Sequence, residues 1–331
     1  MTHRQMKLCV SLLLLIACTF HFPKCTHAAD VELADDGSKV TVTLDGEPFT
    51  EYHYKGFAKP ILFPVLGPGQ RPMTRSYPIV NGVDNEATDH PHHKSLWYTH
   101  DEVAGVRFWI ESDPEKPIKN SGTQVTTSVK LEGDSIVTTN DWVASDGETV
   151  CSDERRLTFA GDEDARTIDY EVTWIASSGE VLIGDTKEGT MGIRTHPMLR
   201  LTTKPNIGNH TADGRAINSE GQRDRELWGK RAAWVDYWGT IENQVTGVAI
   251  FDHELNPRHP TWWHARDYGL IAANPFGIHD FEKKPDGTGD LTLAAGEKLT
   301  FRYRFVFHRG DAEEAKVAQR YAEYIKATSG K

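Results

Sequence analysis

The sequence predicts an all-β protein, built as one large antiparallel β-sandwich with a C-terminal helix. Apolar and polar side chains alternate in two long segments, whose apolar members are Phe301, Tyr303, Phe305, Phe307 in one and Ile168, Tyr170, Val172, Trp174 in the other. Successive side chains of a strand point to opposite faces, so each segment presents one apolar face to a core. The stretch Val40–Leu44 alternates as well and runs into Asp45-Gly46, a strong signal for a β-hairpin turn.

Further turns and strands extend this pattern. Ser-Asp-Gly at 145–147 and Pro-Asp-Gly at 285–287 predict turns, and 244–251 and 269–273 predict strands. A helix is expected at about 311–328. It begins at the capping residue Asp311, with Glu314 three positions on, and it carries an apolar stripe of Val317, Ala318, Tyr321, Tyr324 and Ile325. Two long polar segments, 77–93 and 206–226, are expected as loops, and loops of this length are often functional.

Composition excludes several classes of protein. Of 331 residues, 38% are hydrophobic and 10% aromatic, which allows a sizeable core and argues against a disordered chain. There are 37 Lys and Arg residues against 48 Asp and Glu residues, a formal net charge of −11. General binders of nucleic acid or of anionic membranes carry basic surfaces, so no nucleic acid is expected as a partner.

The N-terminus predicts export to the periplasm or the medium. Arg4 and Lys7 precede a short apolar run at 8–17, as in a signal peptide, and cleavage after Ala28 would leave a single β-sandwich domain of residues 29–331. The run is too short for a permanent membrane span, and no later segment approaches that length. The alternative is a lipoprotein cleaved before Cys18 and anchored through it. After cleavage at Ala28, Cys151 is the one cysteine left, so no intramolecular disulfide is expected.

Histidines gather in the segment 89–100, which reads Asp-His-Pro-His-His-Lys-Ser-Leu-Trp-Tyr-Thr-His. Histidine serves near neutral pH as an acid, a base or a metal ligand. Pro91 favours an extended His90, which would place His90 and His92 on one side and His93 on the other. One interpretation is acid–base catalysis with His92 or His93 as the acid. The other is a transition-metal site with His90 and His92 as ligands, although no HExxH or paired CxxC pattern accompanies them, and no cofactor is predicted.

A second motif, at 184–196, combines glycines with charged side chains. It is not a phosphate-binding P-loop, because the order of Gly, Lys and Ser/Thr is absent. Asp185 and Glu188 are candidates for a general base. The other polar members are expected to contact the substrate, Arg194 as a clamp on a carboxylate or hydroxyl, together with Lys187 and His196.

A third motif spans 258–268 and 274–280. Trp262 and Trp263 stand beside polar side chains, an arrangement that suits a carbohydrate because a sugar offers apolar C–H faces and hydroxyls; the same aromatics also fit a core. The residues of this motif that are expected to bind substrate are Trp263, His264, Asp267, Asn274 and His279. Arg75, earlier in the chain, is expected to bind substrate as well. No nucleophile elbow and no dinucleotide fingerprint is present.

These motifs together resemble a bacterial family labelled "methane oxygenase PmoA", a domain of unknown function. The matching stretches lie at 59–60, 64–68, 74–78, 88–97, 184–189, 263–268 and 274–277. The namesake of the label is an integral membrane protein and this chain has no spanning segment, so methane is not expected as its substrate. The pattern also looks similar to the galactose-mutarotase-like supersandwich, whose members handle sugars with a histidine acid and a carboxylate base.

Three functions follow as hypotheses. The first is an exported carbohydrate-active enzyme, an isomerase, lyase or hydrolase, that acts on a sugar or glycoside through a histidine and a carboxylate. The second is a metal-dependent oxidoreductase with His90 and His92 as ligands. The third is a non-catalytic sugar-binding module that uses Trp262 and Trp263. The first requires the three motifs, up to about 190 residues apart, to meet at one site.

Overall fold

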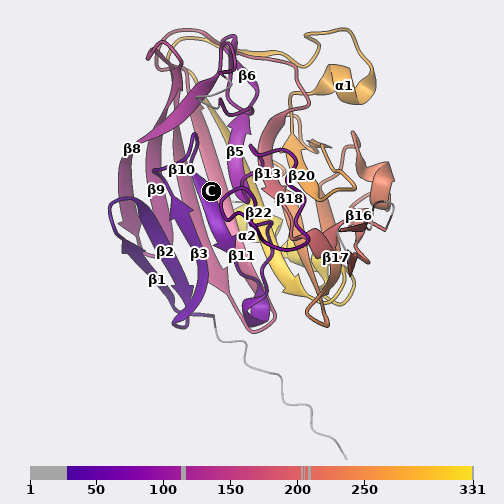
Figure 1. Cartoon of the computed structure of the whole chain (residues 1–331). Coiled ribbons are helices and arrows are strands. Elements are labelled where there is room, and N and C mark those ends of the chain that lie inside the picture. Colours follow the sequence, from indigo (N-terminus) through magenta and orange to yellow (C-terminus); the bar gives the residue numbers. More distant parts are fainter. Residues whose placement is uncertain (1–27, 113–116, 203, 205, 208–209, 330–331) are drawn as a thin grey trace, which may run out of the picture.

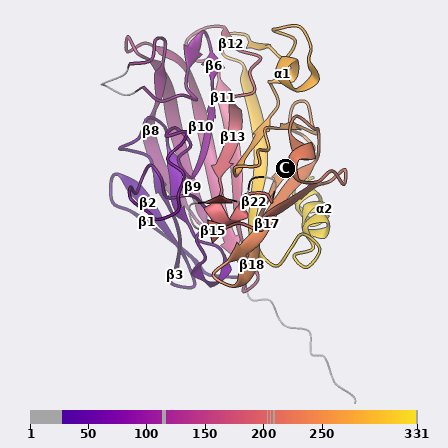
Figure 2. The same ribbon diagram turned by 45° about the vertical axis from the view of Figure 1, so that its right-hand side comes forward.

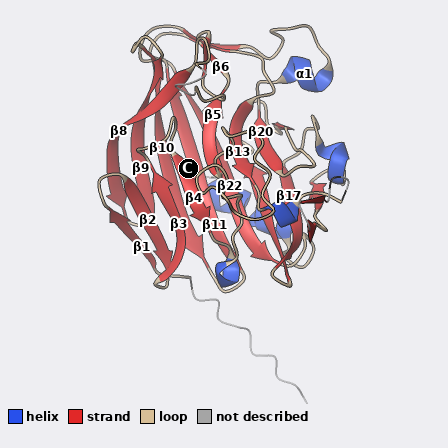
Figure 3. Ribbon diagram, viewed as in Figure 1, coloured by secondary structure: helices blue, strands red, loops and turns tan. Residues whose placement is uncertain are grey.

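Two eight-stranded antiparallel sheets pack face to face and enclose the main apolar core (Figures 1 and 3). The computed structural model describes residues 28–112, 117–202, 204, 206–207 and 210–329. The predicted signal peptide, with Cys18, therefore lies outside the described residues except for Ala28. Within the described ranges no helix combines the length and apolarity that crossing a membrane requires. The prediction of an all-β sandwich is confirmed.

The first sheet, called here the site sheet, carries the strands that come from the predicted motifs. Its spatial order is β1 (Val31–Asp35), β2 (Lys39–Leu44), β3 (Glu47–His53), β4 (Ile61–Val65), β5 (Leu96–His100), β13 (Gly189–Arg194), β20 (Leu270–Asn274) and β19 (Trp262–Trp263).

The second sheet, called here the back sheet, contains the longest strands. Its order is β16 (Arg215–Asn218), β17 (Trp234–Ile241), β18 (Gln244–Asp252), β22 (Lys298–Arg309), β11 (Ala165–Ile175), β10 (Thr149–Gly161), β9 (Ser135–Ala144) and β8 (Gly122–Glu132).

Smaller elements close the ends of the sandwich. One small sheet joins β21 (Leu291–Leu293), β12 (Val181–Ile183), β6 (Glu102–Val103) and β7 (Val106–Arg107), and one hairpin joins β14 (Asn206–Ile207) and β15 (His210–Thr211). The helical segments are the 3₁₀ turns η1 (Pro68–Gln70), η2 (Pro197–Leu199) and η3 (Asp224–Leu227), and the helices α1 (Ile278–Glu282) and α2 (Val317–Thr328).

The alternating segments form strands as expected. Phe301, Tyr303, Phe305 and Phe307 are buried on β22 and pair with β11. Asp45 and Gly46 both adopt positive φ, 52° and 76°, and form the turn between β2 and β3. This turn suits the right-handed twist of the two strands.

The C-terminal helix begins later than predicted. Asp311 and Glu314 do form the expected reciprocal cap, because Asp311 Oδ1 accepts from the backbone N–H of Glu314 and Glu314 Oε2 accepts from that of Asp311. The capped segment is only a turn, since Lys316 takes a left-handed conformation with φ of 54° and α2 begins at Val317. The apolar side of α2 covers the back sheet over β18 and β22, on the face away from the core (Figure 2).

The two predicted loops differ from each other. The segment 77–93 has no strand or helix, as expected. The segment 206–226 is partly ordered, because it contains β14, β15, β16 and the start of η3. The backbone bridges Leu201–Gly214 and Ile217–Arg223 hold parts of this segment in place. Pairings of this kind cannot be predicted from a run of polar residues alone.

Candidate active site

Strand pairing brings the three motifs onto one face of the site sheet. Gly192 on β13 lies between Trp97 on β5 and Ala272 on β20. His264 follows in the same row, because it exchanges both backbone hydrogen bonds with Ala272. Trp97 and Ala272 belong to an apolar cluster separate from the main core, so this row points away from the core. The motifs at 89–100, 184–196 and 258–268 therefore meet by register.

Four aromatic rings form a stack on this face. His93 lies parallel to Trp97 at 5.4 Å between ring centroids and to His90 at 4.8 Å, and His90 lies parallel to Tyr268 at 5.2 Å. His92 stands edge-on to His93. His90 does contact His92, but the expectation that His93 lies on the opposite side is wrong, because His93 stacks on His90. His90 is not extended but has a positive φ of 47°, and the His93 N–H donates to the His90 carbonyl, so the segment turns.

Two arginines hold this turn in place through Asp89. Arg75 Nη1 and Arg194 Nη2 donate to Asp89 Oδ1 at 2.6 and 2.7 Å. Although burial acts in the opposite direction, the bond to His90 and the two guanidinium groups hold the pKa of Asp89 well below its usual range. Arg75 also donates to the carbonyls of Tyr77, Ala87, His90 and His93, which occupies all its N–H groups. Its contacts make Arg75 a positioning residue rather than the substrate contact expected.

The inner histidines are held in their neutral form. Burial lowers the pKa of His93 well below its usual value, and burial followed by the charge of Lys59 lowers that of His92 to about 3. Arg194 Nη1 lies 3.1 Å from His93 Nδ1, and a guanidinium can only donate, so the ring proton of His93 is on Nε2. Neither ring is charged near neutral pH, which leaves them as hydrogen-bonding groups.

His90 differs from its neighbours. Its side chain is 40% exposed, and Nδ1 lies 3.1 Å from Asp89 Oδ2. This contact puts a carboxylate behind the ring and favours a proton on Nδ1. Nε2 has no partner within the described part of the chain, so His90 presents one free nitrogen at the mouth of the site.

Glu188 adds a carboxyl group to the site, beside Lys187 and His264. Its carboxyl group accepts no backbone N–H; Lys187 Nζ is 3.5 Å from one oxygen and His264 Nδ1 is 4.0 Å from the other. Burial, reinforced by Asp101 and Asp280, raises the pKa of Glu188, and the charge of Glu188 acts in turn on Tyr268. The side chain remains 27% exposed. Glu188 is therefore a carboxyl group that the fold leaves available.

His264 completes the floor of the site beside Glu188. Its Nδ1 lies 2.9 Å from the Lys187 carbonyl, which only accepts, so the proton of the neutral ring is on Nδ1 and Nε2 carries a lone pair. Burial and then the charge of Arg266 lower the pKa of His264 to about 3.

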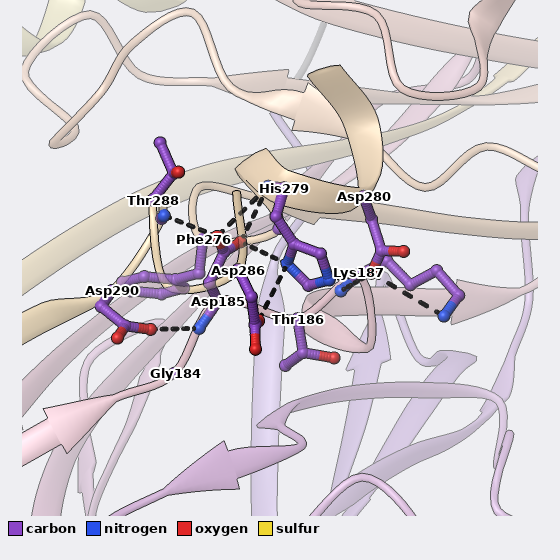
Figure 4. A network of polar contacts seen from close by, with 12 residues as sticks. Gly184, Asp185, Thr186, Lys187, Phe276, His279, Asp280, Asp286, Thr288 and Asp290 are labelled. Atoms are coloured by element: carbon purple, nitrogen blue, oxygen red, sulfur yellow. Dashed lines mark hydrogen bonds and ion pairs between the residues drawn. The ribbon is translucent and has the colours of Figure 1, made fainter. Parts of the chain in front are cut away.

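Asp185 has a different role from Glu188, although the sequence offered both as bases. Its buried carboxylate accepts from the backbone N–H groups of His279 and Gly289, and lies 3.1 Å from His279 Nδ1 (Figure 4). Asp280 on α1 accepts from the Lys187 N–H. Asp185 thus fastens the 184–189 segment to α1 and the loop that follows it, and its oxygens are occupied.

Several other residues predicted to bind substrate are instead buried in the fold or line other cavities. Trp263 is fully buried in the core and donates to the Ala232 carbonyl. Asn274 is buried and joins the Thr186 carbonyl to the N–H groups of Phe276 and Gly277. His196 lines a separate cavity of about 600 Å³, and Asp267 one of about 350 Å³. The site therefore retains His90, His92, His93, Glu188, Lys187, Arg194, His264 and, at its edge, His279.

A family profile matches residues 39–322 of the chain, and it describes a family of unknown function, DUF6807. The chain belongs to the DUF6807 family. No curated protein matches the sequence. The family description agrees with the expected domain of unknown function, but it does not carry the methane-oxygenase label suggested by the sequence motifs.

Solved structures similar to the DUF6807 chain share little sequence with it. The galactosidase domain of an α-galactosidase–sucrose kinase has a TM-score of 0.42 at 8% identity, over 85% of this chain and 42% of that one. A galactose mutarotase-like protein from Clostridium acetobutylicum has 0.36 at 10%, over 85% and 99%. A putative aldose 1-epimerase from Escherichia coli K12 has 0.34 at 10%, over 85% and 99%. This chain spans less than half the length of the first of these proteins.

The sequence reading missed two residues of the DUF6807 site. Tyr268 joins His90, Arg194 and Glu188, and the Arg266 guanidinium lies 5.4 Å from the centre of its ring. A signal for both was present: His264, Arg266 and Tyr268 alternate, so in an extended segment they share a face. We predicted Asp267 instead, which lines the adjacent cavity of about 350 Å³ together with Arg266.

The metal hypothesis finds no ligand set among the described residues. In these ranges no group of three or more His, Cys, Asp or Glu side chains is placed to hold an ion. His90 and His92, the predicted ligands, stand edge to face with ring centroids 5.8 Å apart.

The buried histidines predict a fold that weakens in mild acid. The pKa of His264 is lowered to about 3 and that of buried His100 to about 4, both chiefly by burial, against about 6.5 in an unfolded chain. As the pH is lowered, these two rings take up protons in the unfolded chain at a higher pH than in the folded chain. The free energy of unfolding should therefore fall as the pH drops from about 6.5 to 4. The expected loss is about 1.4 kcal/mol per pH unit for each ring. Urea unfolding at pH 7 and 5 measures it. His264→Gln should show a shallower decline, and equal slopes would contradict this account.

Proposed function

We propose that this DUF6807 protein is a carbohydrate-active enzyme that acts on a sugar or glycoside by acid–base chemistry, with His90 and Glu188 as the proton-transferring pair. The observation that carries the proposal is the gathering of two available polar groups at one site: His90 stacks on Tyr268 with a free ring nitrogen, and the charge of Glu188 acts on the same Tyr268. The charge of His90 also acts on His264, which lies 4.0 Å from Glu188. A histidine and a carboxyl group at one site are what acid–base catalysis at a sugar requires.

The roles follow from the surroundings of each group. His90, with Asp89 Oδ2 3.1 Å from its Nδ1, is the acid of the scheme and donates a proton from Nε2 to a ring or glycosidic oxygen. Glu188 can take the proton of a hydroxyl, and its raised pKa keeps it closer to neutral pH than a solvated carboxyl. In ring opening of a reducing sugar, the anomeric hydroxyl proton goes to Glu188 while His90 protonates the ring oxygen as its bond to the anomeric carbon breaks. Closure on the other face reverses both transfers.

The neutral histidines have supporting roles in this scheme. His92 and His93 were expected as the acid, but burial keeps both uncharged near neutral pH, so the acid role passes to His90. His264 offers the lone pair of Nε2 to a sugar hydroxyl beside Glu188. Export of the protein, by signal peptide or lipid anchor, belongs to the proposal as well and is tested by the location of the mature chain in fractionated cells.

A sugar-binding module built on Trp262 and Trp263 is less well supported. Trp263 lies in the core, and Trp262 is buried, donates to Glu282 and has the Arg231 guanidinium over its ring at 4.4 Å. Neither indole presents a free face to a sugar.

The test is turnover on a panel of reducing sugars and aryl glycosides, followed by polarimetry and by release of the aryl group. On the best substrate, His90→Gln is expected to lower kcat/KM by about 10²- to 10³-fold and to remove one limb of the pH profile. His210→Gln, an exposed histidine outside the site, is the matched control and should leave both unchanged. Absence of turnover across the panel, or an unaltered profile in His90→Gln, overturns the proposal.

A further inference from the structure

A cavity of about 350 Å³ opens beside the proposed active site. It is lined by Lys204, Arg225, Trp228, Ala265, Arg266 and Asp267. Three cationic side chains thus face one carboxylate, in a chain whose net charge is −11. The Asp267 carboxylate offsets only part of this positive charge. Its nearest cation is Arg225, at 3.7 Å from Oδ2 to Nε, and this ion pair is weak because Arg225 is largely exposed. The cavity is therefore a positively charged spot on an acidic protein.

Arg266 links this cavity to the catalytic groups. Its guanidinium makes no hydrogen bond or ion pair within the described part of the chain, and it lies 5.4 Å from the centre of the Tyr268 ring. Its charge acts on both His264 and Tyr268. A guanidinium group whose N–H donors are free, beside an active site, suits a bidentate contact with an oxyanion.

Trp228 contributes its ring to the cavity wall. The ring packs edge-on against Phe281 at 5.6 Å, and Phe281 in turn packs against His264 at 6.3 Å. The wall of the cavity is therefore continuous with the floor of the site.

From these observations we infer that the substrate is a sugar bearing an oxyanion, a carboxylate or a sulfate, which Arg266 and Arg225 bind in this cavity. The inference rests on the proposed function and names its substrate class. The cavity volume lies within the range of sites for small ligands. Binding the anion at Arg266 holds the sugar ring next to Tyr268, on which His90 stacks.

Titration calorimetry on the full chain tests this without requiring turnover. The ligands are D-glucuronate, D-galacturonate and D-glucose 6-sulfate, with D-glucose and D-galactose as neutral references. At low salt, at least one anionic sugar should bind about tenfold or more tightly than its neutral counterpart, and added salt should reduce the difference. Which anion shows the preference identifies the substituent.

Arg266→Gln should abolish this preference, a loss of about tenfold in affinity for the anionic sugar alone. The matched control is Arg156→Gln, an exposed arginine on the back sheet, which should keep it. Equal affinity for anionic and neutral sugars, no binding of any anionic sugar, or a preference that persists in Arg266→Gln overturns the inference. The outcomes separate the two proposals: charge-selective binding without turnover of any sugar overturns only the proposed function, and turnover of neutral sugars without that selectivity overturns only the inference.

Discussion

Replacing Glu188 by Gln is expected to lower kcat by about 10²- to 10⁴-fold, the range typical for loss of a general acid or base. The amide keeps the size of the side chain but cannot take a proton. The fold should survive, because the carboxyl group accepts no backbone N–H and its nearest charged partner, Lys187 Nζ, is 3.5 Å away and 38% exposed. Initial rates on the best substrate, with the thermal midpoint of unfolding, measure both effects.

Two further variants sharpen this result. Glu180→Gln, an exposed glutamate on the same connection between β11 and β13, should retain full activity. Asp185→Asn removes the charged acceptor of two backbone N–H groups, so it should lower the thermal midpoint as well as the rate. A folded Glu188→Gln enzyme with unchanged activity would show that Glu188 has no catalytic role.

Replacing Arg155 by Met is expected to reduce the free energy of unfolding by about 3–5 kcal/mol, the usual result of removing one partner of a buried ion pair. Arg155 and Asp153 are both fully buried on β10, and the guanidinium binds both carboxylate oxygens at 2.9 and 2.6 Å. Arg155 also donates to Gln124 Oε1, and Gln124 Nε2 donates to the Tyr98 carbonyl on β5. The pair therefore joins the back sheet to the strand that bears Trp97.

The neighbouring residue provides the control. Arg156 points to the opposite face of the same strand, where its side chain is 45% exposed and pairs with Glu132 at the surface. An exposed pair of this kind contributes about 0–1 kcal/mol, so Arg156→Met should change little. Guanidinium unfolding curves of the two variants give the comparison. If Arg155→Met is too unstable to purify, Arg155→Lys, which keeps a positive charge beside Asp153 but loses the two-point contact, should show a smaller loss. Similar losses in Arg155→Met and Arg156→Met would contradict this account of the network.

The fold followed from local patterns because those patterns report directly on burial. Alternation on β11 and β22 reflects one face in the core, and Asp45-Gly46 has the φ angles that a hairpin turn needs. The start of α2 was misplaced because a capping box also closes a single turn, and the left-handed Lys316 leaves no mark in the sequence. His90 was misplaced for a similar reason, since the clamp by Arg75 and Arg194 outweighs the preference set by Pro91.

The all-β class, the strands of the long hairpins and the three motifs with the polar side chains of the site were predictable from residue patterns alone. Which of those side chains are free depends on the folded arrangement. Asp185 and Glu188, three residues apart, are alike in the sequence, but strand pairing and α1 supply backbone donors to the first and leave the second open. His90 and His93 are likewise the same residue type in one motif. Burial keeps His93 uncharged, while His90 stays exposed beside Asp89. Desolvation and hydrogen-bond saturation depend on contacts between distant segments, and those contacts exist only once the chain has folded.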